Sequence, residues 1–309
     1  MTAQQSTPVS CPARVPSAHL TRPDGARLAL YSDGPDTPGL VVIFAHGWQA
    51  AASIWERHAD ELLRRHPDIR VVRYDQRGHG ASTPGSEEPS ISLLAGDLRA
   101  IIQDQAPDGL PVALVGHSMG GMAVLGLAAE HPQLLDDQVV AVVLAATTSG
   151  ALDLAARLNP VHRRLLGLTR RAMAELCLRV PRPAERVRDF VRPRPYPQPP
   201  IDIAARWYRA LMTHDVTSRL EALRRVRVHL LVGEVDRHIP PVHAVRLAAQ
   251  IPGAVVHLVP RGGHRLPTQH PREVHAVLVR ACKEALEGVT VRPGEPRHHA
   301  AESGRRAHQ

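Results

Sequence analysis

Residues 114–121 read LVGHSMGG and place Ser118 between glycines where two sequence patterns meet. Residues 111–116 are almost entirely apolar, as expected of a strand covered on both faces. Residues 119–131 have the apolar spacing of a helix. A serine at such a junction is either a small residue in a glycine-rich turn or a nucleophile held out on a sharp turn. The surrounding sequence has to decide between these two interpretations.

The rest of the chain alternates short apolar runs with longer segments of helical spacing, a pattern that predicts an α/β protein. The strand candidates are residues 28–31, 40–45, 70–75, 111–116, 139–146, 228–233 and 254–259. The helix candidates are residues 53–65, 92–105, 119–131, 241–250 and 271–286. Because the runs from residue 40 onward do not alternate with polar residues, we expect a mostly parallel central sheet with helices on both faces.

Residues 150–215 interrupt this alternation with helical pieces broken by VPRP and RPRPYPQPP, whose prolines block helix continuation. We therefore expect an α/β core built from residues 18–149 and 216–288, with residues 150–215 inserted as a helical cap. Residues 1–17 are predicted to be a flexible N-terminus. Residues 289–309 are rich in Arg, His, Gly and Pro and are predicted to be a disordered tail.

The composition narrows the class of protein. Hydrophobic residues make up 43% of the 309 positions, which is enough for a substantial core. No apolar run has the length of a signal peptide or a membrane span. The three cysteines, Cys11, Cys177 and Cys282, are far apart and predict neither a disulfide framework nor a zinc site. We expect a soluble cytoplasmic protein that makes no membrane contact.

The net charge of +8 raises the question of a nucleic-acid partner. The chain has a single lysine, Lys283, and only two phenylalanines, so platforms for stacking bases are few and no nucleic acid is expected. Residues 150–215 hold thirteen arginines against six carboxylates. This excess indicates either a solvated outer face or a cap that steers an anionic substrate or an acidic carrier protein.

A nucleophilic serine needs a base to remove its proton and a third group to orient that base. Asp236 follows one strand candidate in LVGEVDRHIP, and His264 follows the next in LVPRGGHRLP. Groups that follow the strands of an open parallel sheet lie at one edge, so we expect Ser118, Asp236 and His264 to lie together. Glu234 would turn to a similar side of an extended segment, and the sequence leaves it open as the carboxylate.

Five motifs in this order resemble the α/β-hydrolase family from about residue 18 to residue 287, outside the cap. They are AHGW (45–48), DQRGHG (75–80), GHSMGG (116–121), GEVDRHIP (233–240) and GGH (262–264). The resemblance implies that Ser118 is the nucleophile, His264 the general base and Asp236 its orienting partner. It also implies an oxyanion hole formed by the backbone N–H groups of Trp48 and Met119.

Other polar residues near the motifs are expected to be structural. DQRGHG predicts a glycine-rich loop whose charged groups hydrogen-bond locally, and His46 and His117 are expected to be buried and hydrogen-bonded. Gln269 departs from the family pattern, in which a glutamate often precedes His-Pro. We expect little effect on the chemistry, because that position starts the last helix.

These residues predict a serine hydrolase that cleaves a small-molecule carboxylic ester through an acyl-enzyme, without a metal or an organic cofactor. The expected pocket is mainly aliphatic, and its candidate residues are Trp48, Met119, Trp207, Tyr208, Met212 and Ile239. Thioesterase, lactonase and cofactor-free perhydrolase activities would use the same three catalytic residues and stay open. The alternative from another class is a non-catalytic member of the fold that binds a ligand.

Overall fold

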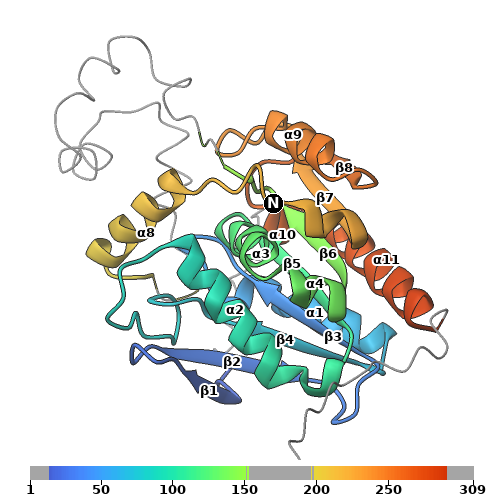
Figure 1. The fold of residues 1–309 in the computed structure, drawn as a ribbon, viewed down its shortest axis with the longest axis horizontal. Coiled ribbons are helices and arrows are strands. Elements are labelled where there is room, and N and C mark those ends of the chain that lie inside the picture. Colours follow the sequence, from blue (N-terminus) through green and yellow to red (C-terminus); the bar gives the residue numbers. More distant parts are fainter. Residues whose placement is uncertain (1–13, 151, 153–195, 197, 291–309) are drawn as a thin grey trace, which may run out of the picture.

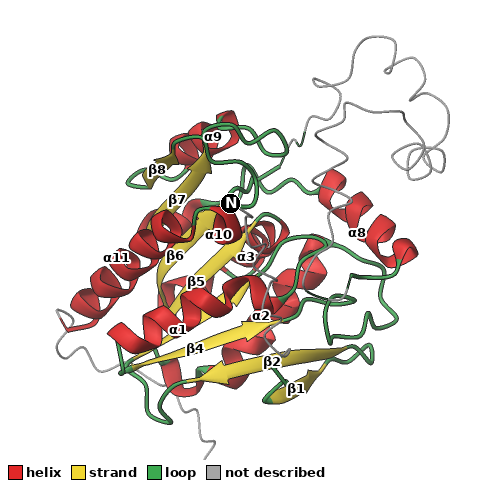
Figure 2. Cartoon of the chain, turned by 180° about the vertical axis from the view of Figure 1, so that it is seen from behind, coloured by secondary structure: helices red, strands yellow, loops and turns green. Residues whose placement is uncertain are grey.

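The computed structural model describes residues 14–150, 152, 196 and 198–290. Their strands form one eight-stranded sheet in the order β1-β2-β4-β3-β5-β6-β7-β8 (Figures 1 and 2). The strands are β1 Ala18–Thr21, β2 Arg27–Asp33, β3 Leu40–Ala45, β4 Ile69–Tyr74, β5 Val112–His117, β6 Val139–Ala145, β7 Arg227–Gly233 and β8 Val255–Val259. β2 pairs antiparallel with both β1 and β4, and all other pairs are parallel. The predicted mostly parallel sheet is confirmed.

Helices cover both faces of this sheet (Figure 1). They are α1 Glu56–Arg65, α2 Ile91–Gln105, α3 Met119–Glu130, α4 Pro132–Asp137, α8 Ile201–Thr213, α9 Val242–Gln250, α10 Leu266–Gln269 and α11 Pro271–Thr290. Along β3, Val41 and Ile43 pack with α2 and α3, whereas Leu40 and Val42 pack with α1 and α11. Because both faces are covered, the strand is apolar throughout.

The N-terminal edge differs from the expectation. β1 is not predicted by the sequence analysis, because this short edge strand is largely exposed and has no apolar run. Arg14 forms ion pairs with Asp33, Glu56 and Asp60, and the Ser17 N–H donates to the Leu30 carbonyl at 2.8 Å. Residues 14–17, which the sequence analysis assigned to a flexible terminus, are therefore held against the fold.

Most of the predicted cap and residues 291–309 of the predicted tail lie outside the described residues, whereas residues 289 and 290, also assigned to the tail, end α11. The part of the cap that is described ends in α8, which packs beside α2 and α3 (Figure 1). Ile203 and Trp207 of α8 share an apolar cluster with Leu94 of α2 and Met119 of α3. This contact brings α8 to the edge of the sheet at which Ser118 lies.

A buried ion network links the start of the sheet to α2. The Arg77 guanidinium pairs with Asp97 and, at 2.5 Å, with Asp24, while Arg22 pairs with Asp97 at 2.9 Å. Burial alone would raise the pKa of Asp24, but the hydrogen bond from Arg77 and those from the backbone amides of Glu87 and Ala26 hold this pKa below its usual value.

None of the described helices is both long and apolar enough for a membrane span.

Candidate active site

Ser118 lies on a sharp turn between the last residue of β5 and the first residue of α3. Its φ of 53° and ψ of −116° are unusual for a residue other than glycine. The Ser118 N–H donates to the Ala145 carbonyl at 2.9 Å, and the Thr147 hydroxyl donates to the Ser118 carbonyl at 2.8 Å. A Cβ on Gly120 would lie 2.3 Å from the Ala45 carbonyl oxygen, so the turn requires glycine there. Strain held in this way is typical of functional sites.

The Ser118 side chain contacts His264, which in turn contacts Asp236, although the three residues are far apart in the sequence. Its Oγ lies 3.0 Å from His264 Nε2, and His264 Nδ1 lies 2.8 Å from Asp236 Oδ2. With its proton on Nδ1, the imidazole donates to Asp236 and accepts from the serine hydroxyl. Ser118 and Asp236 are buried at 8% and 3% exposure, while the His264 side chain keeps 17%. The three expected residues are brought together.

Asp236 is held as a carboxylate. Burial alone would raise its pKa, but the hydrogen bond from His264 and the backbone N–H groups of His238 and Ile239 lower the pKa below its usual value. Those two N–H groups donate to Oδ1 at 2.8 and 3.0 Å, which leaves Oδ2 for His264. Both oxygens of the carboxylate therefore face donors.

Glu234 does not share this position. Its side chain is exposed and its Oε2 accepts the Arg261 N–H at 2.7 Å. The segment after β7 is not extended, because the Asp236 N–H returns to the Gly233 carbonyl in a turn. The turn sends the two carboxylates in different directions, and Asp236 is the one that contacts His264.

The loop after β3 lies directly beside Ser118. A Cβ on Gly47 would lie 3.2 Å from the Ser118 Cβ and 2.8 Å from His117 Nδ1, so the chain approaches this closely only because residue 47 has no side chain. Trp48 follows Gly47, and Met119 is the first residue of α3. The two backbone amides named in the sequence analysis thus belong to segments on either side of Ser118.

Residues 75–80, DQRGHG, form a structural loop, but their hydrogen bonds are not only local and extend to the loop after β3. The Ala52 N–H donates to Asp75 Oδ1 at 2.7 Å, and the Gln49 N–H donates to His79 Nε2 at 3.2 Å. The Gln76 N–H donates to His46 Nε2 at 2.9 Å. Gln49 has a φ of 52°, a conformation that needs such support. Residues 75–79 therefore brace the loop that carries Trp48.

The histidines that take part in this bracing are neutral. Burial lowers the pKa of His46 to about 4 and that of His79 to about 3. Neutral rings can accept the two backbone N–H groups that a protonated ring would repel. Burial also lowers the pKa of His117 to about 3, and its Nε2 lies 2.8 Å from the His264 carbonyl oxygen. His117 thus connects the turn at Ser118 to the loop of His264.

A family model with the description "Alpha/beta hydrolase family" matches residues 42–277, which is more than half of the chain. The chain belongs to the alpha/beta hydrolase family. A bifunctional esterase/perhydrolase of Acinetobacter calcoaceticus is 26% identical over 279 residues, which are 84% of this chain and 98% of that protein.

Solved alpha/beta hydrolase structures have the same fold. A carboxylesterase structure from the thaumarchaeon Nitrososphaera gargenis matches with a TM-score of 0.67 at 21% identity, over 88% of this chain and 100% of that one. An esterase of Exiguobacterium antarcticum matches with a TM-score of 0.65 at 19% identity, over 86% and 98%. Together with the family match, these likenesses place the protein among the alpha/beta hydrolase enzymes.

Most candidate pocket residues of this alpha/beta hydrolase pack in or against one apolar cluster, and Met212 does not belong to it. Met119, Trp207 and Ile239 belong to one apolar cluster, against which Trp48 packs. The Trp48 indole N–H donates to the Ala204 carbonyl of α8 at 3.0 Å, and its ring lies 5.3 Å from that of Tyr208. Met212 is only half-buried and is not a member of this cluster.

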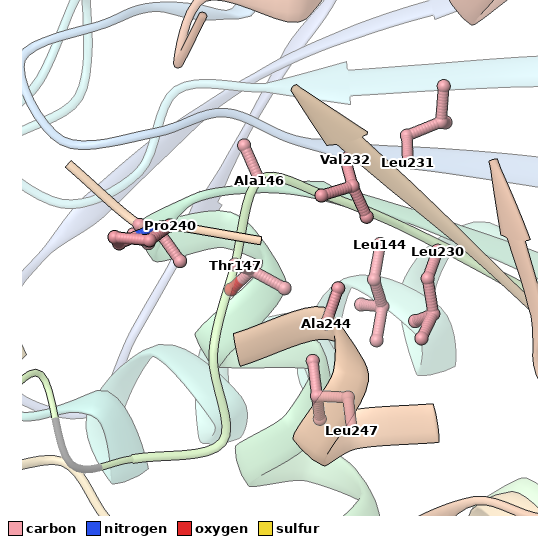
Figure 3. Close-up of a pocket in the computed structure, with 10 residues that line it drawn as sticks. Leu144, Ala146, Thr147, Leu230, Leu231, Val232, Pro240, Ala244 and Leu247 are labelled. Atoms are coloured by element: carbon pink, nitrogen blue, oxygen red, sulfur yellow. The ribbon is translucent and has the colours of Figure 1, made fainter. Parts of the chain in front are cut away.

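A small cavity lies beyond Ile239, between β6, β7 and α9 (Figure 3). Leu144, Thr147, Leu230 and Leu247 are among its lining residues, and its volume is about 10 Å³. That is room for about one water molecule. The cavity is therefore a packing defect behind the site and is too small for an acyl group.

Proposed function

We propose that this alpha/beta hydrolase cleaves a carboxylic ester, with Ser118 as nucleophile and His264 as general base. The observation that carries the proposal is the continuous hydrogen-bond chain from Ser118 Oγ through His264 to Asp236. A serine hydroxyl is a weak nucleophile at neutral pH and becomes reactive when a base takes its proton during attack. Asp236 keeps that base in the productive tautomer and stabilises the imidazolium that forms.

The reaction has two halves. In the first, Ser118 Oγ attacks the ester carbonyl, its proton passes to His264 Nε2 and then to the leaving alcohol, and an acyl-enzyme remains. In the second, water gives a proton to His264 and attacks the acyl carbon, which releases the acid and restores the serine hydroxyl. No metal or organic cofactor is needed, because the base, the acid and the donors are all protein groups.

The Trp48 and Met119 amides are the proposed oxyanion hole for both halves. Attack leaves negative charge on the carbonyl oxygen, and each fixed N–H dipole aimed at that oxygen stabilises the transition state by about 3 kcal/mol. Met119 begins α3, so the positive end of the helix acts in the same direction. The bracing by Asp75 and His79 fixes the loop of Trp48 before substrate arrives.

Ester chemistry is supported by the names of the relatives, which include the esterase/perhydrolase of Acinetobacter calcoaceticus. That same relative supports one second candidate, in which hydrogen peroxide replaces water in the second half and the product is a peracid. Formation of peracetic acid from acetate and hydrogen peroxide, compared with ester hydrolysis by the same sample, measures the ratio of the two activities.

A finer proposal is that the cap steers a substrate that is anionic or is carried by an acidic protein. Eleven of the thirteen cap arginines lie outside the described residues, and the other two, Arg206 and Arg209, pair with Glu88. Steering by the cap predicts that kcat/KM for an anionic ester falls with added salt more steeply than for a matched neutral ester. Equal salt dependence for the two esters would leave the arginines as a solvated face.

The decisive experiment measures the intact mass after exposure to a fluorophosphonate, followed by p-nitrophenyl ester turnover. We expect one adduct and measurable turnover for the wild type, neither for Ser118→Ala, and both for Ser53→Ala, which removes an exposed hydroxyl at the start of the 3-10 helix before α1. A folded wild type that forms no adduct would contradict the proposal and favour a ligand-binding role.

A further inference from the structure

His238 is a titratable side chain at the site that the proposed reaction does not use. It lies two residues after Asp236, and its ring centroid is 4.9 Å from that of His264. One donor atom each from Asp236, His238 and His264 lie within 4.8 Å of one another. Asp236 is buried, His264 is half-buried and His238 is exposed, so the group opens to solvent on one side.

Two imidazoles and one carboxylate form a ligand set that Zn²⁺ accepts. Zinc ligands lie about 2.0–2.2 Å from the ion, so two ligands of a tetrahedral ion are roughly 3.4 Å apart. His264 Nδ1 and Asp236 Oδ2 are 2.8 Å apart and need to separate only slightly. The exposed His238 side chain has to approach them by at most about 1.4 Å.

We propose that a divalent transition-metal ion such as Zn²⁺ binds Asp236, His238 and His264 and reversibly inhibits the enzyme. The ion takes the place of the proton that His264 Nδ1 shares with Asp236, and the ring shifts to the other tautomer by losing that proton and gaining one on Nε2, so no proton is released overall. A neutral imidazole bound to metal through Nδ1 carries its remaining proton on Nε2. His264 then cannot accept the proton of Ser118.

The inhibition rests on the proposed function, whereas the metal binding does not, so each is measured separately. Binding is measured by competition with a chromophoric zinc chelator at neutral pH. Inhibition is measured on p-nitrophenyl acetate over a zinc titration, followed by EDTA. The test variant is His238→Gln, which removes one ligand outside the proposed catalytic groups.

The matched control is His257→Gln. His257 Nε2 lies 3.0 Å from His229 Nδ1, so this variant removes one member of another close histidine pair. Histidines elsewhere in the chain contribute equally to all three proteins, so the comparison is by difference. The site should be present in His257→Gln and lost in His238→Gln.

We expect His238→Gln to keep its turnover in metal-free buffer within about twofold and to need at least about tenfold more zinc for half-inhibition, because losing a metal ligand costs at least this factor in affinity. EDTA should restore wild-type turnover. Equal zinc affinity and inhibition in wild type and His238→Gln would overturn the site. Zinc affinity that depends on His238 in a protein without esterase turnover would support the metal site and overturn the proposed function instead.

Discussion

Replacing Asp236 with asparagine should reverse the hydrogen bond that orients His264. Oδ1 of Asp236 accepts the N–H groups of His238 and Ile239, so an asparagine has to place its carbonyl oxygen there. Its NH₂ group then occupies the place of Oδ2, 2.8 Å from His264 Nδ1. Because an NH₂ group donates, Nδ1 must accept, and the imidazole proton moves to Nε2.

The proton on Nε2 then faces Ser118 Oγ across 3.0 Å, where the wild-type ring accepts. A base in this wrong tautomer cannot take the serine proton, and we expect kcat to fall by about 10⁴-fold, which is about 5.5 kcal/mol in the activation free energy. The two bonds to Oδ1 are retained by the amide oxygen. Thermal unfolding should therefore change little, which separates this loss from misfolding.

The matched control is Glu234→Gln, the same chemical change two residues away. Glu234 accepts an N–H from Arg261 and has no contact with His264, so we expect kcat within about threefold of wild type, as for a surface substitution. Both variants are assayed by p-nitrophenyl acetate hydrolysis and by the rate of fluorophosphonate labelling. A fall in kcat of less than tenfold in Asp236→Asn would refute the assignment of Asp236. A fall in kcat of more than tenfold in Glu234→Gln would refute it as well.

Three further outcomes concern the fold, and urea unfolding measures each. Gly120→Ala should lower the free energy of unfolding by more than about 3 kcal/mol, because the added Cβ would lie 2.3 Å from a backbone carbonyl oxygen. Gly96→Ala is the control, because the space around Gly96 is open, and this variant should raise the free energy of unfolding by up to about 1 kcal/mol. Arg77→Met should cost about 3–5 kcal/mol because it removes a buried partner of Asp97, and a cost under 1 kcal/mol would contradict this. His79, whose pKa is lowered from 6.5 to about 3, binds a proton in the unfolded chain first, so its contribution is complete above pH 6.5 and is lost as the pH falls toward 3. Between these two pH values the free energy of unfolding should fall by about 1.4 kcal/mol per pH unit for each such histidine. In His79→Gln the free energy of unfolding should fall less steeply with pH than in the wild type.

The order of strands and helices could be predicted because burial on both faces leaves a continuous apolar run. Residues 40–45 were predicted as a strand and form β3 with the same bounds. β1 could not be predicted in this way, since an exposed edge strand is held by backbone hydrogen bonds rather than by apolar side chains. Backbone pairing leaves no pattern in the residue types.

The positions of Ser118, Asp236 and His264 after their strands predicted that they would lie at one edge. The family resemblance pointed to Asp236 as the carboxylate, but the parity argument did not separate it from Glu234, because that argument assumes extended backbone and the chain turns after Gly233. The bracing of the Trp48 loop by His79 had no local signal either. Its two partners, Gln49 and His79, are thirty positions apart.

The sequence by itself therefore determined the class of fold, the order of most strands and helices along the chain and the set of polar groups that meet at the edge of the sheet, because burial and strand ends are properties of local pattern. Only the tertiary structure decided which carboxylate faces His264, which side chains hold the loop of Trp48, and that His238 lies against His264. These are contacts between segments that the sheet brings together, and their directions depend on turns whose geometry side-chain type alone does not specify.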